Sequence, residues 1–401
     1  MNPYFEKLGR TVLERWQQQN FSLEAFPELA RTAMEEAPPS ENVDLEEMVQ
    51  EFLANDNQPV QGQSGFGQPE LIAFTDPRFY IQILFWMEGT TDIHQHEFSG
   101  AFHVMQGSSV HSEFEFEGAQ PVTPHIRTGD LSLKQIELLE TGRTVPINSG
   151  RDCIHSLFHL DTPSVTVVVR THHDPGTGPQ FNYLPPHIGF DPVQGDALTL
   201  RRKQLLDVLE TIDYEGYVGL VSNMIETLDF ERGFHTLQHT MDRLQILEEW
   251  ESVLAKFQKK HGDLAKGVPA TLAEAHRRDV ITQMRYHIGN PEHRFFLALV
   301  MNITDGKGIQ SLVSKRYPEQ SPIETVLGWL DELIEPSEFG LTLLDGVFNF
   351  SESFDMEQQY DLLLDEVRQA LELDSDGAVK APLNPEIHAV LLSSSLRPLF
   401  A

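Results

Sequence analysis

The residues with the clearest chemistry are two histidines separated by a single residue, in His94-Gln95-His96. On a β-strand, residues two apart point to the same face, so both imidazoles can reach one ion. Imidazole nitrogen binds iron, zinc, copper and nickel, and a rigid strand keeps such ligands in place. The pair therefore predicts a metal site. Two buried, hydrogen-bonded histidines without an ion are the alternative.

A third histidine, His155, lies on a later predicted strand and completes a recognisable pattern. Gly89, His94, His96 and the closing Gly107 resemble the first motif of the cupin family, and the residues around His155 resemble the second. The resemblance implies that the three imidazoles share one ion inside a β-barrel. Iron(II) is the expected metal, with zinc, nickel, manganese and copper as alternatives because imidazole accepts all of them.

Within the cupins, the chain is most similar to cysteine dioxygenase and the related three-histidine thiol dioxygenases. The matching segments are Ile-Leu-Phe-Trp-Met-Glu-Gly at 83–89, Val-Met-Gln-Gly at 104–107 and Ile-Asn at 147–148. Where most cupins carry a glutamate ligand, this sequence has Gly100, which leaves three histidines as the implied ligand set. The resemblance covers roughly residues 70–175 and implies a reaction with O2.

The same resemblance fails at the residues that act on the substrate. Thiol dioxygenases carry a Ser-His-Tyr relay after the third ligand, and the corresponding positions here hold Val168, Arg170 and His172. The arginine that anchors the substrate carboxylate has no match either, so Arg78 and Arg170 are proposed as substitutes. If the strand register holds, Arg170 and His172 face the barrel interior. There, Arg170 would bind a carboxylate and His172 would exchange a proton.

Four further residues have a structural interpretation. His103 is expected to point away from the barrel interior, and His111 and His159 to be packing or solvated residues. His159 is also a candidate to support His155 from behind. Cys153 shares the parity of His155, but a core cysteine is the favoured interpretation.

The elements that must position these residues are short strands between about Glu70 and His173. The runs are apolar or alternating, rich in β-branched and aromatic residues, and separated by Gly, Pro, Asn and Asp, which predicts a sandwich or barrel of the jelly-roll kind. The expected strands are Leu71–Phe74, Phe79–Met87, Gly100–Gln106, Val110–Phe116, Leu131–Leu139, Cys153–Leu160 and Val165–Thr171.

Helical periodicity is found on both sides of this region. Apolar residues three and four apart predict helices at Tyr4–Gln17 and Leu45–Leu53, and again along most of the sequence after about Gly195. The expected fold class is therefore α+β and multidomain. It consists of a helical N-terminal segment and linker at 1–66, a cupin barrel at 67–192 and an α-helical domain at 193–401.

Composition limits the partners of this chain. Of its 401 residues, 61 are acidic and 29 are basic, a net charge of −32 that argues against nucleic acid and against anionic lipid. A single cysteine fits a reducing compartment, and no apolar run is long enough to span a membrane, so a cytoplasmic protein is expected.

Two functions remain open at this point. The first is a mononuclear non-heme Fe(II) dioxygenase related to thiol dioxygenases, which oxidises a small substrate, with a carboxylate-bearing one as the candidate. The second is a metal-binding or catalytically inert cupin that acts as a sensor or interaction module through its helical domain. That domain is expected to cap the barrel, to form a homodimer or to recruit a partner.

Overall fold

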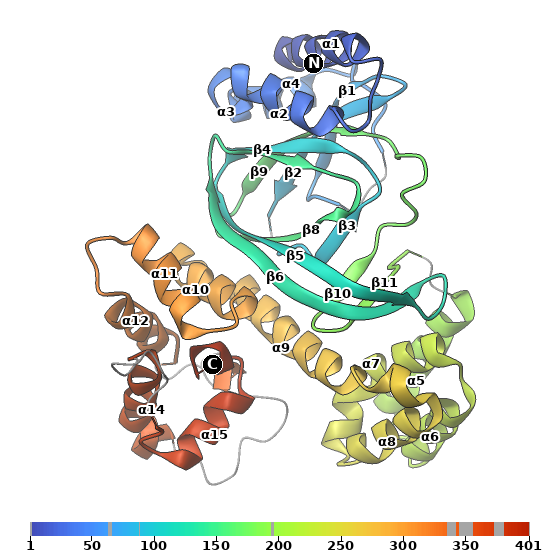
Figure 1. Cartoon of the computed structure of the whole chain (residues 1–401), viewed down its shortest axis with the longest axis vertical. Helices are drawn as coiled ribbons and strands as arrows, with labels where there is room; N and C mark the ends of the chain where they lie inside the picture. Colours follow the sequence, from blue (N-terminus) through green and yellow to red (C-terminus); the bar gives the residue numbers. More distant parts are fainter. Residues whose placement is uncertain are drawn as a thin grey trace. The chain divides into compact units, whose positions relative to one another are not determined.

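The computed structural model describes residues 2–62, 66–87, 89–193, 196–334, 342–344, 356–372 and 381–400 (Figure 1). Glu88 of the motif at 83–89 lies outside the described residues. Two compact units share the chain. Unit 1 contains Met1–Phe114, Leu133–Gln180 and Arg285–Ala298, and unit 2 contains Glu115–Ser132, Phe181–Met284 and Leu299–Ala401. The three-part division at 66/67 and 192/193 stays a prediction about the sequence.

The N-terminal helices of unit 1 pack against a β-sheet. They are α1 (Pro3–Gln18), α2 (Phe26–Glu36), α3 (Pro39–Asn42) and α4 (Leu45–Ala54). The side chain of Asn2 caps α1 and that of Asp44 caps α4, each accepting a hydrogen bond from a backbone N–H of the first turn. Their apolar faces share one core with strands β1 (Glu70–Thr75), β2 (Phe79–Trp86) and β9 (Ser164–Thr171), which explains why the predicted helices at Tyr4–Gln17 and Leu45–Leu53 form.

The strands form two antiparallel layers. The first sheet has the order β1-β2-β9-β4-β7, and a six-stranded closed barrel has the order β10-β11-β6-β5-β8-β3. The first sheet consists of β1 (Glu70–Thr75), β2 (Phe79–Trp86), β9 (Ser164–Thr171), β4 (Gly100–Gln106) and β7 (Thr144–Ile147). The barrel strands are β10 (Asn182–Leu184), β11 (Ile188–Phe190), β6 (Ile126–Glu140), β5 (Ser108–Pro121), β8 (Gly150–His159) and β3 (Ile93–His96).

The helices that follow Gly195 in the sequence complete the fold. They are α5 (Ala197–Thr211), α6 (Tyr217–Thr227), α7 (Phe230–Ile246), α8 (Trp250–His261), α9 (Val268–His287), α10 (Pro291–Asn302), α11 (Gly306–Arg316), α12 (Pro322–Ile334), α14 (Met356–Leu371) and α15 (Pro385–Ser393). The predicted fold class, an α+β chain with a closed β-barrel and with helical segments before and after it in the sequence, is confirmed. Within the described ranges, no helix has the length and apolar character that crossing a membrane requires.

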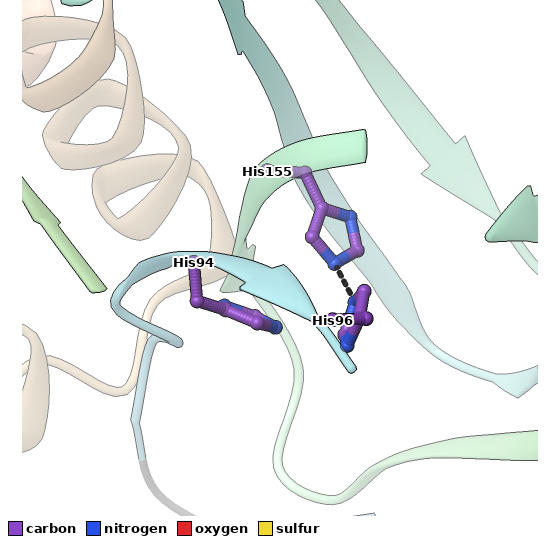
Figure 2. A group of neighbouring side chains, drawn as sticks. All are labelled: His94, His96 and His155. Atoms are coloured by element: carbon purple, nitrogen blue, oxygen red, sulfur yellow. Dashed lines mark hydrogen bonds between the residues drawn. The ribbon is translucent and has the colours of Figure 1, made fainter. Parts of the chain in front are cut away.

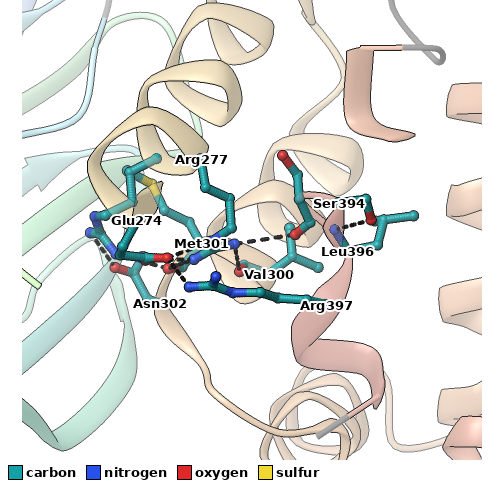
Figure 3. Close-up of polar contacts among 10 residues, drawn as sticks. Glu274, Arg277, Val300, Met301, Asn302, Ser394, Leu396 and Arg397 are labelled. Atoms are coloured by element: carbon teal, nitrogen blue, oxygen red, sulfur yellow. Dashed lines mark hydrogen bonds and ion pairs between the residues drawn. The ribbon is translucent and has the colours of Figure 1, made fainter. Parts of the chain in front are cut away.

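A buried ion pair joins three segments of unit 2 (Figure 3). Arg277 binds both carboxylate oxygens of Glu274 at 2.8 Å. Its remaining N–H groups reach the backbone oxygens of Val300 at 2.8 Å, Met301 at 3.0 Å and Ser395 at 3.1 Å. The pair therefore satisfies carbonyls at the end of α10 and holds the C-terminal segment beside α9. A buried pair of charges is tolerated when its hydrogen bonds are satisfied in this way.

Candidate metal centre

Two neighbouring strands carry the three predicted ligands. Strand β3 pairs antiparallel with β8, and His94 lies directly opposite His155. An irregularity in the register between Gln95 and His96 separates this pair from the next, in which His96 lies opposite Gly150. Figure 2 shows the three imidazoles turned toward one another. The structure thus brings together the three histidines that the sequence singled out.

The distances suit a shared ion. One ring nitrogen from each histidine lies within 4.8 Å of the other two, and Nε2 of His96 is 2.8 Å from Nε2 of His155. Nitrogen ligands at about 2.1 Å from an ion, on adjacent coordination positions, are about 3 Å apart. All three side chains are buried, with at most 4% of their surface exposed.

Hydrogen bonds fix which nitrogen of His94 carries the proton. Its Nδ1 lies 2.7 Å from the backbone oxygen of Asp92, which can only accept, so Nδ1 is the protonated atom. The lone pair is then on Nε2, a buried atom that has no hydrogen-bond partner among the described residues. A buried acceptor without a partner is costly, and a cation in the centre of the trio would satisfy it.

Burial also keeps the three imidazoles neutral. Loss of solvation lowers the pKa of His94, and it lowers the pKa values of His96 and His155 well below the usual value, with neighbouring imidazoles adding to the effect. The neutral ring is the form that binds a metal. The trio therefore fits a metal ion in geometry and in charge, and His94 fits it in tautomer as well.

Gly100 shows why no fourth ligand comes from the position where most cupins have glutamate. The residue pairs with Arg170 and Ile147 on the neighbouring strands. A Cβ atom at Gly100 would lie 2.2 Å from the backbone oxygen of Val169, far inside van der Waals contact. A side chain here would require the strands to separate. Position 100 therefore cannot supply a ligand to the trio.

A small cavity of about 40 Å³ borders the trio. A single water needs about 10–15 Å³ by this measure, so the space suits a few waters or a small ligand. Its lining, besides the three histidines, is Phe66, Gln82, Leu84, Trp86, Thr91, Phe98, Phe102, Ile147, Leu157, Thr166 and Val168. Thr91 and Thr166 already accept hydrogen bonds from the backbone of Leu157 and from the Trp86 indole.

Arg170 lies close to the cavity but does not line it. Its guanidinium stacks on Phe98, 3.3 Å from the ring centroid, and donates to the backbone oxygens of Thr171 and His172. Burial lowers the pKa of this arginine, and Tyr80 and nearby carboxylates oppose that shift. Phe98 itself lines the cavity, so the arginine contacts the site through this ring.

The other two predicted substrate residues lie away from the trio. His172 follows the last residue of β9, is exposed, and binds the backbone oxygen of Asp76 at 3.0 Å. The expectation that it faces the barrel interior was wrong, because strand parity ends where the strand ends. Arg78 is exposed and stacks over Phe21 at 4.3 Å.

His103, His159 and Cys153 are surrounded by packing and hydrogen-bonding partners outside the trio. His103 is fully buried and its ring nitrogens lie 2.8 Å from the Thr144 hydroxyl and 3.0 Å from that of Ser40. His159 stacks on Trp86 with ring centroids 4.7 Å apart. Burial raises the pKa of the Cys153 thiol to about 12, so the thiolate is disfavoured.

Fold and side chains together define a β-barrel with a buried, converging three-histidine site. Among solved structures the chain is similar to KdgF from a Halomonas species, with 19% identity and a TM-score of 0.21 over 30% of this chain and 93% of that one. It is similar to hydroquinone 1,2-dioxygenase from Sphingomonas sp. TTNP3, with 10% identity and a TM-score of 0.21 over 27% and 68%. A cupin superfamily protein from Desulfitobacterium hafniense DCB-2 shares 12% identity, with a TM-score of 0.19 over 30% and 97%. No protein-family model and no curated protein matches the chain.

Proposed function

We propose that this chain is a mononuclear metal-dependent oxygenase of the cupin class that oxidises a small substrate with O2. The observation that supports this proposal is the convergence of His94, His96 and His155 on one point, with neutral rings and with the Nε2 lone pair of His94 unpartnered. Iron(II) is the proposed ion, and when bound it would supply adjacent open positions for O2 and substrate.

The chain's own residues would orient the substrate and exclude water. The cavity walls are mainly aromatic and aliphatic, including Leu84, Phe102 and Val168, so an apolar part of the substrate is favoured there. Gln82 is 2% exposed and borders the cavity. Its carboxamide can both donate and accept, which makes it the proposed partner for one polar group of the substrate.

If the substrate is a thiol, the proposed reaction is balanced. A thiol RSH and O2 yield the sulfinic acid RSO2H, in which the sulfur loses four electrons and both oxygen atoms of O2 are retained. Two narrower points belong to the same proposal. The first is that the protein is related to cysteine dioxygenase, and the second is that its substrate carries a carboxylate. Arg170 would reach such a carboxylate only if the ring of Phe98 turned aside, because the guanidinium is stacked behind it.

Oxygen uptake by the iron-loaded protein tests the proposal. We expect uptake with at least one member of a panel of small thiols, with and without a carboxylate, and loss of that uptake in His96→Ala. Gln82→Leu should raise KM about tenfold, the effect of one lost hydrogen bond of about 1.4 kcal/mol. Absence of oxygen uptake with every thiol would contradict the hypothesis of a thiol substrate. Uptake that persists in His96→Ala would contradict the hypothesis that the three histidines form the active site.

A specific feature of unit 2 favours a second role for the helical sequence. Helix α5 buries Thr199 and Leu206 but leaves Leu198, Leu205 and Val208 half exposed or more, with Ile212 just beyond its end 64% exposed. These residues are spaced by three, four or seven positions, so they form one exposed stripe along the helix, beside the face that carries Thr199 and Leu206. An apolar stripe of this spacing is typical of helices that pair.

We propose that this stripe pairs with α5 of a second copy in antiparallel orientation. A twofold axis that passes through Leu205 at right angles to the helix runs the two helices antiparallel and gives both copies the same contact, as closed dimers require.

Replacement of Leu205 by glutamate is expected to convert the dimer to a monomer, because it places a carboxylate on the twofold axis. Light scattering coupled to gel filtration of the full chain measures the mass. Leu53→Glu is the matched control, since Leu53 is 80% exposed on α4 and lies outside the stripe. A monomeric wild type at every concentration contradicts the pairing, as does a dimer that Leu205→Glu leaves intact.

A further inference from the structure

A fourth histidine lies directly behind the trio. His111 on β5 is 1% exposed, and its Nε2 is 2.9 Å from Nδ1 of His155. Strand β5 pairs with β8 so that Glu113 is opposite His155 and His111 is opposite Leu157. His111 is therefore the diagonal cross-strand neighbour of His155, within reach on the same face of the sheet. The ring planes cross at 89°.

The other nitrogen of His111 faces a carboxylate. Nδ1 of His111 lies 3.6 Å from Oε1 of Glu137, and the second oxygen of that carboxylate lies 3.6 Å from Arg143. The proximity of His111 and Arg143 lowers the pKa of the Glu137 carboxyl, although its partial burial opposes the shift. The contacts therefore form a line from a half-exposed carboxylate through two imidazoles to the centre of the trio.

Proton positions along this line are coupled. A neutral imidazole carries one proton, so His155 presents the lone pair of Nε2 to the trio only when its proton is on Nδ1. That proton then faces Nε2 of His111, which must accept it, and the proton of His111 must be on Nδ1. This last proton faces the carboxylate of Glu137. The negative charge of this carboxylate, 3.6 Å from Nδ1, favours the proton on that nitrogen of His111 and with it the matching tautomer of His155.

The same residues could also be arranged around an ion of their own. Nδ1 of His111 and carboxylate oxygens of Glu113 and Glu137 lie within 4.8 Å of one another. An ion there would take the lone pair of His111 Nδ1, which moves the proton of His111 to Nε2 and that of His155 to its Nε2. His155 would then be unable to bind an ion in the trio, so the two arrangements exclude each other.

We infer that His111 and Glu137 are positioning residues that hold His155 with its Nε2 lone pair toward the trio. The inference rests on the proposed metal-binding function of the trio. It assigns no second ion to the group at Glu113, because the proton pattern that prepares the trio places the proton of His111 where that ion would bind.

Cobalt(II) affinity of the full chain tests this inference. Protein stripped by a chelator is titrated with Co²⁺ against a chromophoric competitor, and visible absorption counts the bound ions. His111→Phe, which keeps the ring but removes the acceptor, should weaken binding by about 10- to 100-fold. His111→Gln should restore most of the affinity, because its carbonyl can accept from His155 and its amide can donate to Glu137. Glu137→Gln should weaken binding and Glu113→Gln, the matched control, should not.

The outcomes separate the inference from the proposed function. No cobalt bound by the wild type overturns both. One ion bound with unchanged affinity in His111→Phe overturns the inference alone, as does a failure of His111→Gln to restore affinity when its melting temperature matches the wild type. Two ions in the wild type, one of them lost in Glu113→Gln, would show that the group behind the trio is itself an ion site and that the inference is wrong.

Discussion

Replacing His94 with alanine should lower metal affinity by at least about 100-fold, more than the loss of a supporting residue usually costs. His94 is locked in place by its pairing opposite His155 and by its bond to the backbone oxygen of Asp92, so no neighbouring side chain can take over its Nε2 position. Elemental analysis of protein purified without added metal, followed by cobalt titration of stripped protein, measures the effect.

The control for this experiment is His173→Ala, which removes a surface histidine whose side chain is 53% exposed. It should retain the wild-type metal content. Far-ultraviolet circular dichroism of both variants shows whether the barrel is intact. Equal metal content in the wild type and in folded His94→Ala would mean that any bound ion is held elsewhere, and the proposed oxygenase would lose its site.

The ligand trio could be predicted from the sequence because each part of the argument is local. Strand parity places His94 and His96 on one face, and the motif around His155 marks a second strand. The pairing of β3 with β8 then brings the histidines of the two strands together, since it puts His94 opposite His155. The irregularity between Gln95 and His96 was not predictable, because such a change in register leaves no signal in strand periodicity.

The alternation of side chains along a strand predicted the wrong position for His172, because the sequence gives no clear signal for the end of β9. Thr171 is the last residue of the strand, and its hydroxyl donates to Asp174 at 2.6 Å while its backbone N–H bonds to Ser99. These contacts turn the chain before His172, which therefore lies at the surface. Arg170 still follows the interior parity of Val168, but its long side chain stacks on Phe98 at the edge of the cavity.

The sequence alone predicts only a packing or solvated role for His111, because its contact with His155 depends on the register between strands far apart in the sequence. Alternation on β5 places His111 and Glu113 on the same face, which is visible in the sequence. That this face meets His155, and that Glu137 of β6 lies beside it, follows only from the pairing of the strands. A shift of one residue would place His111 on the opposite face.

Acid should destabilise the fold through two buried histidines outside the trio. His159 is fully buried, and burial together with the charge of Arg285 lowers its pKa to about 3; burial lowers that of His103 to about 4. In the unfolded chain both titrate near 6.5. Below that pH the unfolded state binds more protons than the folded state, so stability falls as pH decreases from about 6.5 toward these lowered values.

The expected loss is about 2 kcal/mol for each of the two histidines between pH 7.5 and pH 5, since each pH unit below 6.5 contributes about 1.4 kcal/mol. Denaturant unfolding of chelated protein at both pH values measures it. His159→Phe keeps a ring to stack on Trp86 but cannot titrate, so its pH-dependent loss should be smaller than that of the wild type by about 2 kcal/mol. His173→Ala, at the surface, serves as the control. An identical loss in the wild type and in His159→Phe would mean that His159 is already protonated in the folded barrel, in conflict with its full burial and with the nearby charge of Arg285.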